Sequence, residues 1–108
     1  MNIIEKLGIS ASPWKWVDDY GEELQDINGD TVIDDGSAGD EYIQTISMNS
    51  PDAQLIAAAP EILEALIDTV IFHKKYNLYP NGIKIVNKNI SIIEKATGKT
   101  WEEIKGLL

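Results

Sequence analysis

The spacing of apolar residues changes at Met48, and this change constrains the fold more than any other feature of the chain. Before it lie short segments rich in tryptophan, valine, isoleucine and threonine, which are typical of β-strands. After it, apolar residues recur every three or four positions, which is typical of amphipathic helices. The sequence therefore predicts an α+β fold, in which a small antiparallel β-meander precedes a helical hairpin and a short C-terminal helix.

A chain of 108 residues is long enough for one domain with one modest core. We expect a single domain over 1–108, in which residues 1–49 form a mainly β, acidic part and residues 50–108 a helical part. A short helix ending at Gly8 is expected to open the chain. The meander then needs three to four strands, and its segments are expected around Trp14, Trp16 and Leu24, over 31–33, and over 42–48.

The helical part begins with Ser50 as the expected N-cap of a long helix. Pro60 lacks a backbone N–H, so it either breaks this helix into a short and a long one or only kinks it. A second long helix is expected to end at Gly98, and Thr100 with Glu103 predicts a capping box at the start of the last helix. The inner face of the second helix is expected to carry Val86, Ile90, Ile93 and either Ala96 or Thr97.

The segment "DINGDTVIDDG", which starts at Asp26, resembles a calcium-binding loop. An EF-hand loop needs acidic or amide residues at positions 1, 3 and 5, glycine at 6 and a bidentate acid at 12. Here position 6 is Thr31 and position 12 is Ser37, so two requirements fail. Asn28-Gly29 between strand-like segments instead predicts a β-hairpin with a type I′ turn. We expect a turn and no metal site.

The sequence contains no recognisable pattern for catalysis or for a cofactor. It has no cysteine, which excludes a disulfide framework, a thiolate zinc site and a cysteine nucleophile. His73 is the only histidine, and one imidazole without cysteines does not build a catalytic zinc site. The segment "ATGKT" at 96–100 looks like the end of a phosphate-binding loop, but Ile93 stands where that motif requires glycine. We expect a protein that is not an enzyme and that holds no cofactor.

The net charge of −9 is placed unevenly along the chain. Residues 1–54 carry twelve carboxylates and two lysines, whereas residues 55–108 carry six carboxylates and seven lysines, and there is no arginine. Proteins grip nucleic-acid backbones mainly with lysine and arginine, so direct nucleic-acid binding is not expected. The acidity either keeps the protein soluble or presents an acidic surface to a basic groove on another protein.

The tryptophans and acids of the first half are the candidate binding residues. Trp14 and Trp16 share one face of a strand, where core packing is the favoured interpretation and an exposed binding face the alternative. The candidate binding set is Trp14, Trp16, Asp18, Asp19, Asp34, Asp35, Asp40 and Glu41. An alternative small-ligand site would use Lys74, Lys75, Tyr76 and Tyr79. In that site the lysines and backbone N–H groups would receive phosphate.

The stretches "LGISASPWKW", "INGDTV" and "NSPDAQLIAAAPEILEAL" occur in this order. In this combination the chain resembles a set of small phage and prophage proteins of unassigned function. Those proteins share an SPW or TPW motif, an acidic hairpin and an "LIAAAPELLEAL"-type helix. The matching positions are Ser12-Pro13-Trp14, Asn28-Gly29 and residues 52–66. The chain departs at Pro51-Asp52, where the usual pattern has asparagine and alanine. The resemblance implies a phage origin and no reaction.

These observations predict a phage-type accessory protein that acts by protein–protein interaction in the bacterial host cytoplasm. Its sharper form is an inhibitor of a host defence system that uses the acidic face. The alternative is a small-ligand binder, such as a sponge for a signalling nucleotide. We expect no membrane association, because the apolar runs are short and "MNIIEKLG" lacks a signal-peptide pattern. The broad apolar stripe from Ile62 to Phe72 further predicts a homodimer through the helix over 60–76.

Overall fold

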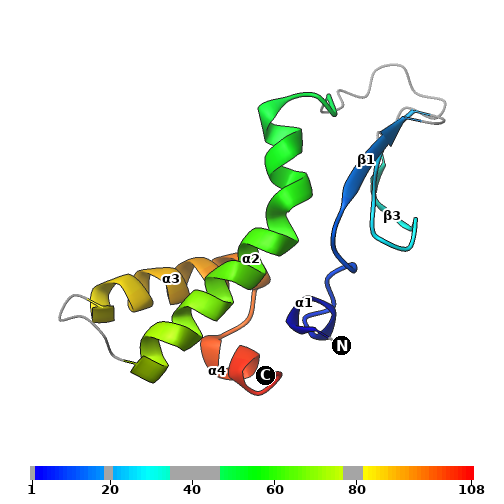
Figure 1. Cartoon of the computed structure of the whole chain (residues 1–108). Coiled ribbons are helices and arrows are strands. Elements are labelled where there is room, and N and C mark those ends of the chain that lie inside the picture. Colours follow the sequence, from blue (N-terminus) through cyan, green and yellow to red (C-terminus); the bar gives the residue numbers. More distant parts are fainter. Residues whose placement is uncertain (1, 19–20, 35–46, 77–81) are drawn as a thin grey trace. The chain divides into compact units, whose positions relative to one another are not determined.

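The computed structural model describes residues 2–18, 21–34, 47–76 and 82–108 (Figure 1). In chain order the elements are α1 (Ile3–Lys6), β1 (Lys15–Asp18), β2 (Glu22–Gln25), β3 (Thr31–Asp34), α2 (Pro51–Tyr76), α3 (Gly82–Thr97) and α4 (Trp101–Lys105). A three-stranded antiparallel sheet is thus followed by helices, among them one long helix and a short C-terminal one. The predicted α+β fold is confirmed.

The chain divides into two compact units. The sheet unit comprises Ile9–Glu61, and the helical unit comprises Met1–Gly8 and Ile62–Leu108. This division differs from the predicted parts over 1–49 and 50–108, because α1 belongs with the later helices and the first turns of α2 belong with the sheet. None of the helices in the described ranges is long and apolar enough to cross a membrane.

The sheet has the strand order β1-β2-β3, with each strand antiparallel to the next. Trp16 pairs with Leu24 across the first ladder, and Leu24 pairs with Ile33 across the second. An irregularity follows Leu24, because the next residue, Gln25, pairs with Thr31 rather than with the residue before Ile33. The further strand predicted over 42–48 lies mostly outside the described residues.

The β2–β3 connection is a tight turn, so the predicted hairpin is confirmed. The N–H of Gly29 donates to the carbonyl of Asp26 at 3.1 Å, and the N–H of Asp26 donates to the carbonyl of Asp30 at 2.9 Å. Gly29 has a φ of +84°, which glycine adopts without strain. Ile27 and Asn28 therefore occupy the centre of the turn, and Gly29 follows in the left-handed region, as in three-residue hairpin loops. The predicted type I′ turn centred on Asn28-Gly29 was wrong.

The core of the sheet unit lies between the sheet and the start of α2. Its buried residues are Trp16, Leu24 and Ala53, and the partly buried residues packed against them are Trp14, Val32, Met48, Ile56 and Ala57. The indole N–H of Trp16 donates to the carbonyl of Ala53 at 2.8 Å. Ser50 caps α2 as predicted, because its hydroxyl accepts the N–H of Ala53 at 3.1 Å.

The helix α2 continues through Pro60, so the alternative with a broken helix does not apply. Proline cannot donate an N–H to the carbonyl of Ile56, so one hydrogen bond of the helix is missing there. The boundary between the two units falls after Glu61, directly beside this position.

In the helical unit each helix contributes apolar side chains to the interior. The buried ones are Ile3 and Ile4 of α1, Leu63, Ile67 and Val70 of α2, Val86 and Ile93 of α3, and Trp101 and Ile104 of α4. The side chain of Asn2 accepts the N–H of Glu5 and caps α1, which is followed by Gly8 at a φ of +79°. On α3 the inner position predicted for Ala96 or Thr97 is taken by Thr97, which is half-buried, whereas Ala96 is exposed. The hydroxyl of Thr97 donates to the carbonyl of Ile93 at 2.8 Å.

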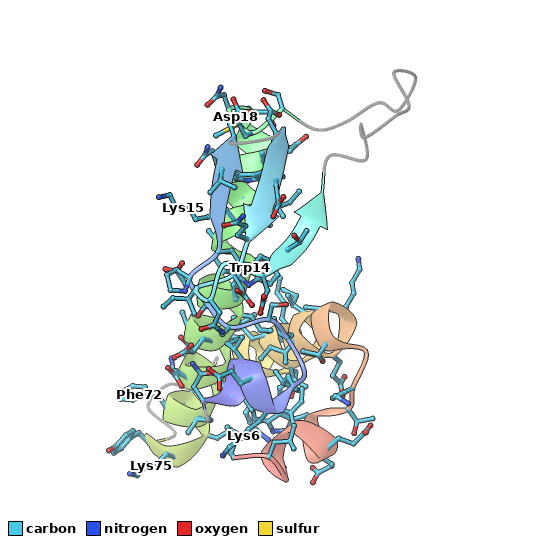
Figure 2. All side chains as sticks on the ribbon, turned by 90° about the vertical axis from the view of Figure 1, so that its right-hand side faces the viewer. Lys6, Trp14, Lys15, Asp18, Phe72 and Lys75 are labelled. Atoms are coloured by element: carbon cyan, nitrogen blue, oxygen red, sulfur yellow. The ribbon has the colours of Figure 1, made fainter. Side chains whose placement is uncertain are left out.

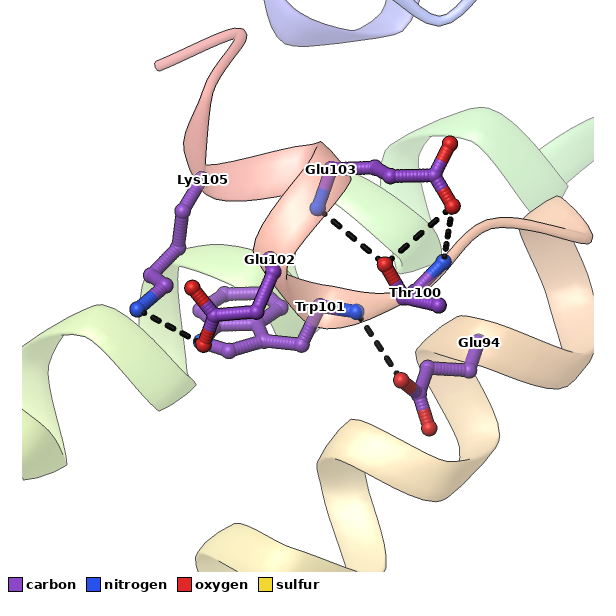
Figure 3. Close-up of polar contacts among 6 residues, drawn as sticks. All are labelled: Glu94, Thr100, Trp101, Glu102, Glu103 and Lys105. Carbon is purple, nitrogen blue, oxygen red and sulfur yellow. Dashed lines mark hydrogen bonds and ion pairs between the residues drawn. The ribbon is translucent and has the colours of Figure 1, made fainter.

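The predicted capping box opens α4 (Figure 3). The N–H of Glu103 donates to the hydroxyl oxygen of Thr100 at 3.2 Å, and the N–H of Thr100 donates to a carboxylate oxygen of Glu103 at 3.1 Å. The hydroxyl of Thr100 also donates to this carboxylate oxygen, at 3.1 Å. The hydrogen bonds that the backbone N–H and the hydroxyl of Thr100 donate to the carboxylate, the backbone one first, lower the pKa of Glu103. A second carboxylate, that of Glu94 on α3, accepts the N–H of Trp101 at 2.9 Å and ties α4 to its neighbour.

Candidate protein-binding surfaces

The structure places the two candidate tryptophans against the core of the sheet unit. Trp16 is only 9% exposed, so its side chain is not available to a partner. Its inclusion among the candidate binding residues is therefore corrected. Trp14 is half-buried, and its indole N–H donates to the carbonyl of Ser10 at 3.0 Å. Trp16 thus packs in the core, which was the favoured interpretation of this pair.

Among the candidate acids, Asp18 is exposed at the end of β1 (Figure 2). The side chains of Asp19, Asp34, Asp35, Asp40 and Glu41 lie outside the described part of the chain. Asp30, in the hairpin loop, is a further exposed carboxylate that the sequence reasoning did not include in the candidate set.

Several carboxylates of the sheet unit have a structural role that the sequence reasoning missed. Glu22 accepts the N–H of Met48 at 3.0 Å, although the two residues are 26 positions apart. Glu23 accepts the hydroxyl of Thr31 at 2.7 Å across β2 and β3. Asp26 accepts the N–H groups of two residues of the hairpin loop, each at 2.9 Å. The signal for Asp26 was readable, since aspartate at this place before a turn commonly binds the backbone that follows.

The hydrogen bonds of Asp26 also bear on the resemblance of this segment to a calcium-binding loop. Asp26 would have been its first ligand, and this carboxylate is engaged by the backbone of the loop. Within the described ranges no three histidine, aspartate or glutamate side chains gather as metal ligands.

The two units differ strongly in net charge. Ile9–Glu61 carries twelve carboxylates and one lysine, a balance of −11, whereas the helical unit carries six carboxylates and eight lysines, a balance of +2. The exposed carboxylates of the sheet unit therefore lie in a field of one sign, with only Lys15 opposing it.

The lysines of the alternative ligand site do not gather. Lys74 and Lys75 are consecutive on α2, so their side chains leave the helix about 100° apart. The ammonium of Lys74 lies 5.9 Å from the ring centroid of Trp101, and that of Lys75 lies 5.4 Å from the ring centroid of Tyr76. Tyr79 lies outside the described residues.

The helical unit exposes a second surface along α2. We call it the outer stripe, and it consists of Ile62, Ala65, Thr69, Phe72 and Tyr76. Ile62, Phe72 and Tyr76 are 49%, 50% and 51% exposed. The rings of Phe72 and Tyr76 are in contact, with centroids 4.9 Å apart, and Phe72 projects away from the other helices of the unit (Figure 2). The broad apolar stripe read from the sequence thus consists of a buried face and this exposed one.

The family model described as Salmonella phage P22 protein Y8K6 matches residues 1–100, which include the sheet and all of α2 and α3.

The chain belongs to this family.

As a member of the P22 Y8K6 family it is a small phage protein, which confirms the origin that its resemblance to phage proteins implied. No curated protein matches the chain, and no solved structure matches it. The family assignment therefore gives the origin of the protein.

Proposed function

We propose that this P22 Y8K6 family member is an accessory protein that acts by binding a basic protein of the host or of the phage through its sheet unit. The observation that carries the proposal is the concentration of charge in that unit, where twelve carboxylates accompany one lysine. A surface of one sign attracts and orients a partner of the opposite sign.

The chemistry of the partner follows from the sign of this charge. Protein surfaces that hold nucleic acid are lined by lysine and arginine, and an acidic protein competes for the same groups. We propose that the partner carries such a groove and belongs to a host defence system, which the phage protein inhibits by occupying it. Asp18 and Asp30, both exposed, are the described carboxylates that would face the groove.

The small-ligand alternative has less support. A phosphate site on α2 would need Lys74 and Lys75 on one surface, whereas each lies over a different aromatic ring.

The test is a comparison of two charge reversals of equal size. Asp18→Lys changes the sheet unit, and Glu102→Lys changes an exposed carboxylate of the helical unit whose only described ion pair is the surface contact with Lys105. Immobilised wild type and both variants are exposed to host lysate at low and moderate salt. We expect Asp18→Lys to weaken capture of the partner roughly three- to tenfold, with Glu102→Lys close to wild type.

The same three proteins are then produced in host cells that carry a defence system, and plaque formation by a sensitive phage is counted. Wild type and Glu102→Lys should raise the count, and Asp18→Lys should raise it less. Capture that is the same for all three proteins and independent of salt would rule out the sheet unit as the binding surface.

A further inference from the structure

We propose that the outer stripe of α2 binds a second copy of this chain, with the two α2 helices antiparallel. This inference concerns another unit and another partner than the proposed function, so either one can fail without the other.

The spacing of the stripe is that of a helix–helix seam. Its five residues follow one another at intervals of three, four, three and four, which is the seven-residue repeat of helices packed side by side. The one polar residue, Thr69, has its hydroxyl satisfied within the helix, because it donates to the carbonyl of Ala65 at 2.8 Å. The seam therefore presents a mainly apolar surface, in which the side chains of Ile62, Phe72 and Tyr76 are each about half exposed to solvent.

The sizes of the residues select the direction of the second helix. Small residues, Ala65 and Thr69, precede the large Phe72 and Tyr76. In an antiparallel pair whose two-fold axis passes between residues 70 and 71, Ala65 faces Tyr76 of the second copy and Thr69 faces its Phe72. Each large side chain then fills the space beside a small one, as close packing requires. A parallel pair would place large against large at Phe72 and Tyr76 and small against small at Ala65 and Thr69, where it would leave a gap.

The charges beside the seam fit the same register. Asp68 and Lys75 are both exposed and stand seven residues apart, so they lie on one flank of the stripe. The ammonium of Lys75 lies 5.4 Å from the ring centroid of Tyr76, which keeps it beside the seam. In the antiparallel register Asp68 of each copy faces Lys75 of the other, and the two-fold symmetry makes this pair twice.

A parallel pair gives no such match. There Asp68 would face the opposite flank of the other helix, which carries the half-buried Leu66 and His73. Charge and side-chain size thus point to the same antiparallel arrangement. Because the seam is short, we expect a dissociation constant on the order of micromolar.

Analytical ultracentrifugation of the full chain over a range of concentrations tests the contact itself. We expect wild type to dimerise and Phe72→Glu to stay monomeric. The control is Ile92→Glu on α3, which changes an apolar side chain of similar exposure, 46%, outside the stripe and should dimerise like wild type. Far-ultraviolet circular dichroism checks that all proteins fold. A wild type that stays monomeric at the highest soluble concentration overturns the proposal.

A charge swap tests the register. Asp68→Lys and Lys75→Asp should each weaken the dimer about tenfold at low salt, since one partner of each pair then meets a like charge. The double variant should restore the affinity of wild type. If the double variant is as weak as the single ones, the antiparallel pairing is wrong.

Discussion

At the scale of single residues, Trp14 and Trp16 show what a sequence pattern leaves open. The pattern placed both on one face, and both do pack on the same core. Their burial differs because Ala53, from the start of α2, lies over Trp16 and accepts its indole N–H. Which later segment covers a strand residue depends on tertiary packing, and the local sequence does not contain that information.

The hydrogen bond of Trp16 gives a prediction with a matched control. Trp16→Phe keeps an aromatic ring in the core but removes a buried donor, so we expect the free energy of unfolding to fall by about 1–2 kcal/mol. Trp14→Phe removes the same group from a more exposed hydrogen bond and should cost less than half of that. Urea unfolding followed by circular dichroism measures both. Equal losses for the two variants would mean that the buried hydrogen bond has no special weight.

At the scale of elements, the sequence predicted most helix ends because their signals are local. Ser50, Gly98, Thr100 and Glu103 act through atoms within four residues, so their effect can be read from the chain. Pro60 was ambiguous for the opposite reason. The sequence shows the hydrogen bond that proline costs a helix, but not the packing that lets α2 continue through it.

The capping box of α4 predicts a specific dependence on pH. The pKa of Glu103 is lower in the folded protein than in the unfolded chain, because the N–H and hydroxyl of Thr100 bind its charged form. Its contribution to stability is therefore present above the ordinary glutamate pKa of about 4.3 and is lost as pH falls through the lower folded value. Glu103→Gln removes this titration but keeps an acceptor for the N–H of Thr100.

We expect wild type to be more stable than Glu103→Gln at neutral pH, with the difference closing as the solution is acidified below the ordinary pKa. Urea unfolding at a series of pH values measures this difference, and the other carboxylates cancel in the comparison. A difference that does not change with pH would show that the charge of Glu103 adds nothing to the cap.

At the scale of the whole molecule, the sequence predicted the order of parts but not their boundary. The change of period at Met48 marks where helix begins, whereas the units divide after Glu61, because the first turns of α2 complete the core of the sheet unit. The candidate surfaces, too, could be predicted only in part. The acidic half and the apolar α2 were visible in the chain, but the separation of α2 into a buried and an exposed face needed the structure.

The charge of the sheet unit predicts how the protein responds to salt. The twelve carboxylates of this unit repel one another, with a single lysine to offset them, and added salt screens this repulsion. At about 0.5 M NaCl the Debye length is well below its value of about 10 Å at 0.1 M. Raising NaCl to this concentration should therefore stabilise the sheet unit against local unfolding. Amide hydrogen exchange measures this residue by residue. Protection of Leu24 should rise severalfold, and that of Ile93 in the helical unit should change less.

The hairpin turn also bears on how long the protein remains chemically intact. Asparagine followed by glycine is the dipeptide most prone to deamidation, which begins when the nitrogen of the glycine attacks the asparagine side chain. In this turn that nitrogen donates its hydrogen to the carbonyl of Asp26, and the backbone there is held in one conformation. The hydrogen bond that shapes the hairpin thus also slows deamidation of Asn28. A molecule in which this turn has opened would deamidate faster than a folded one.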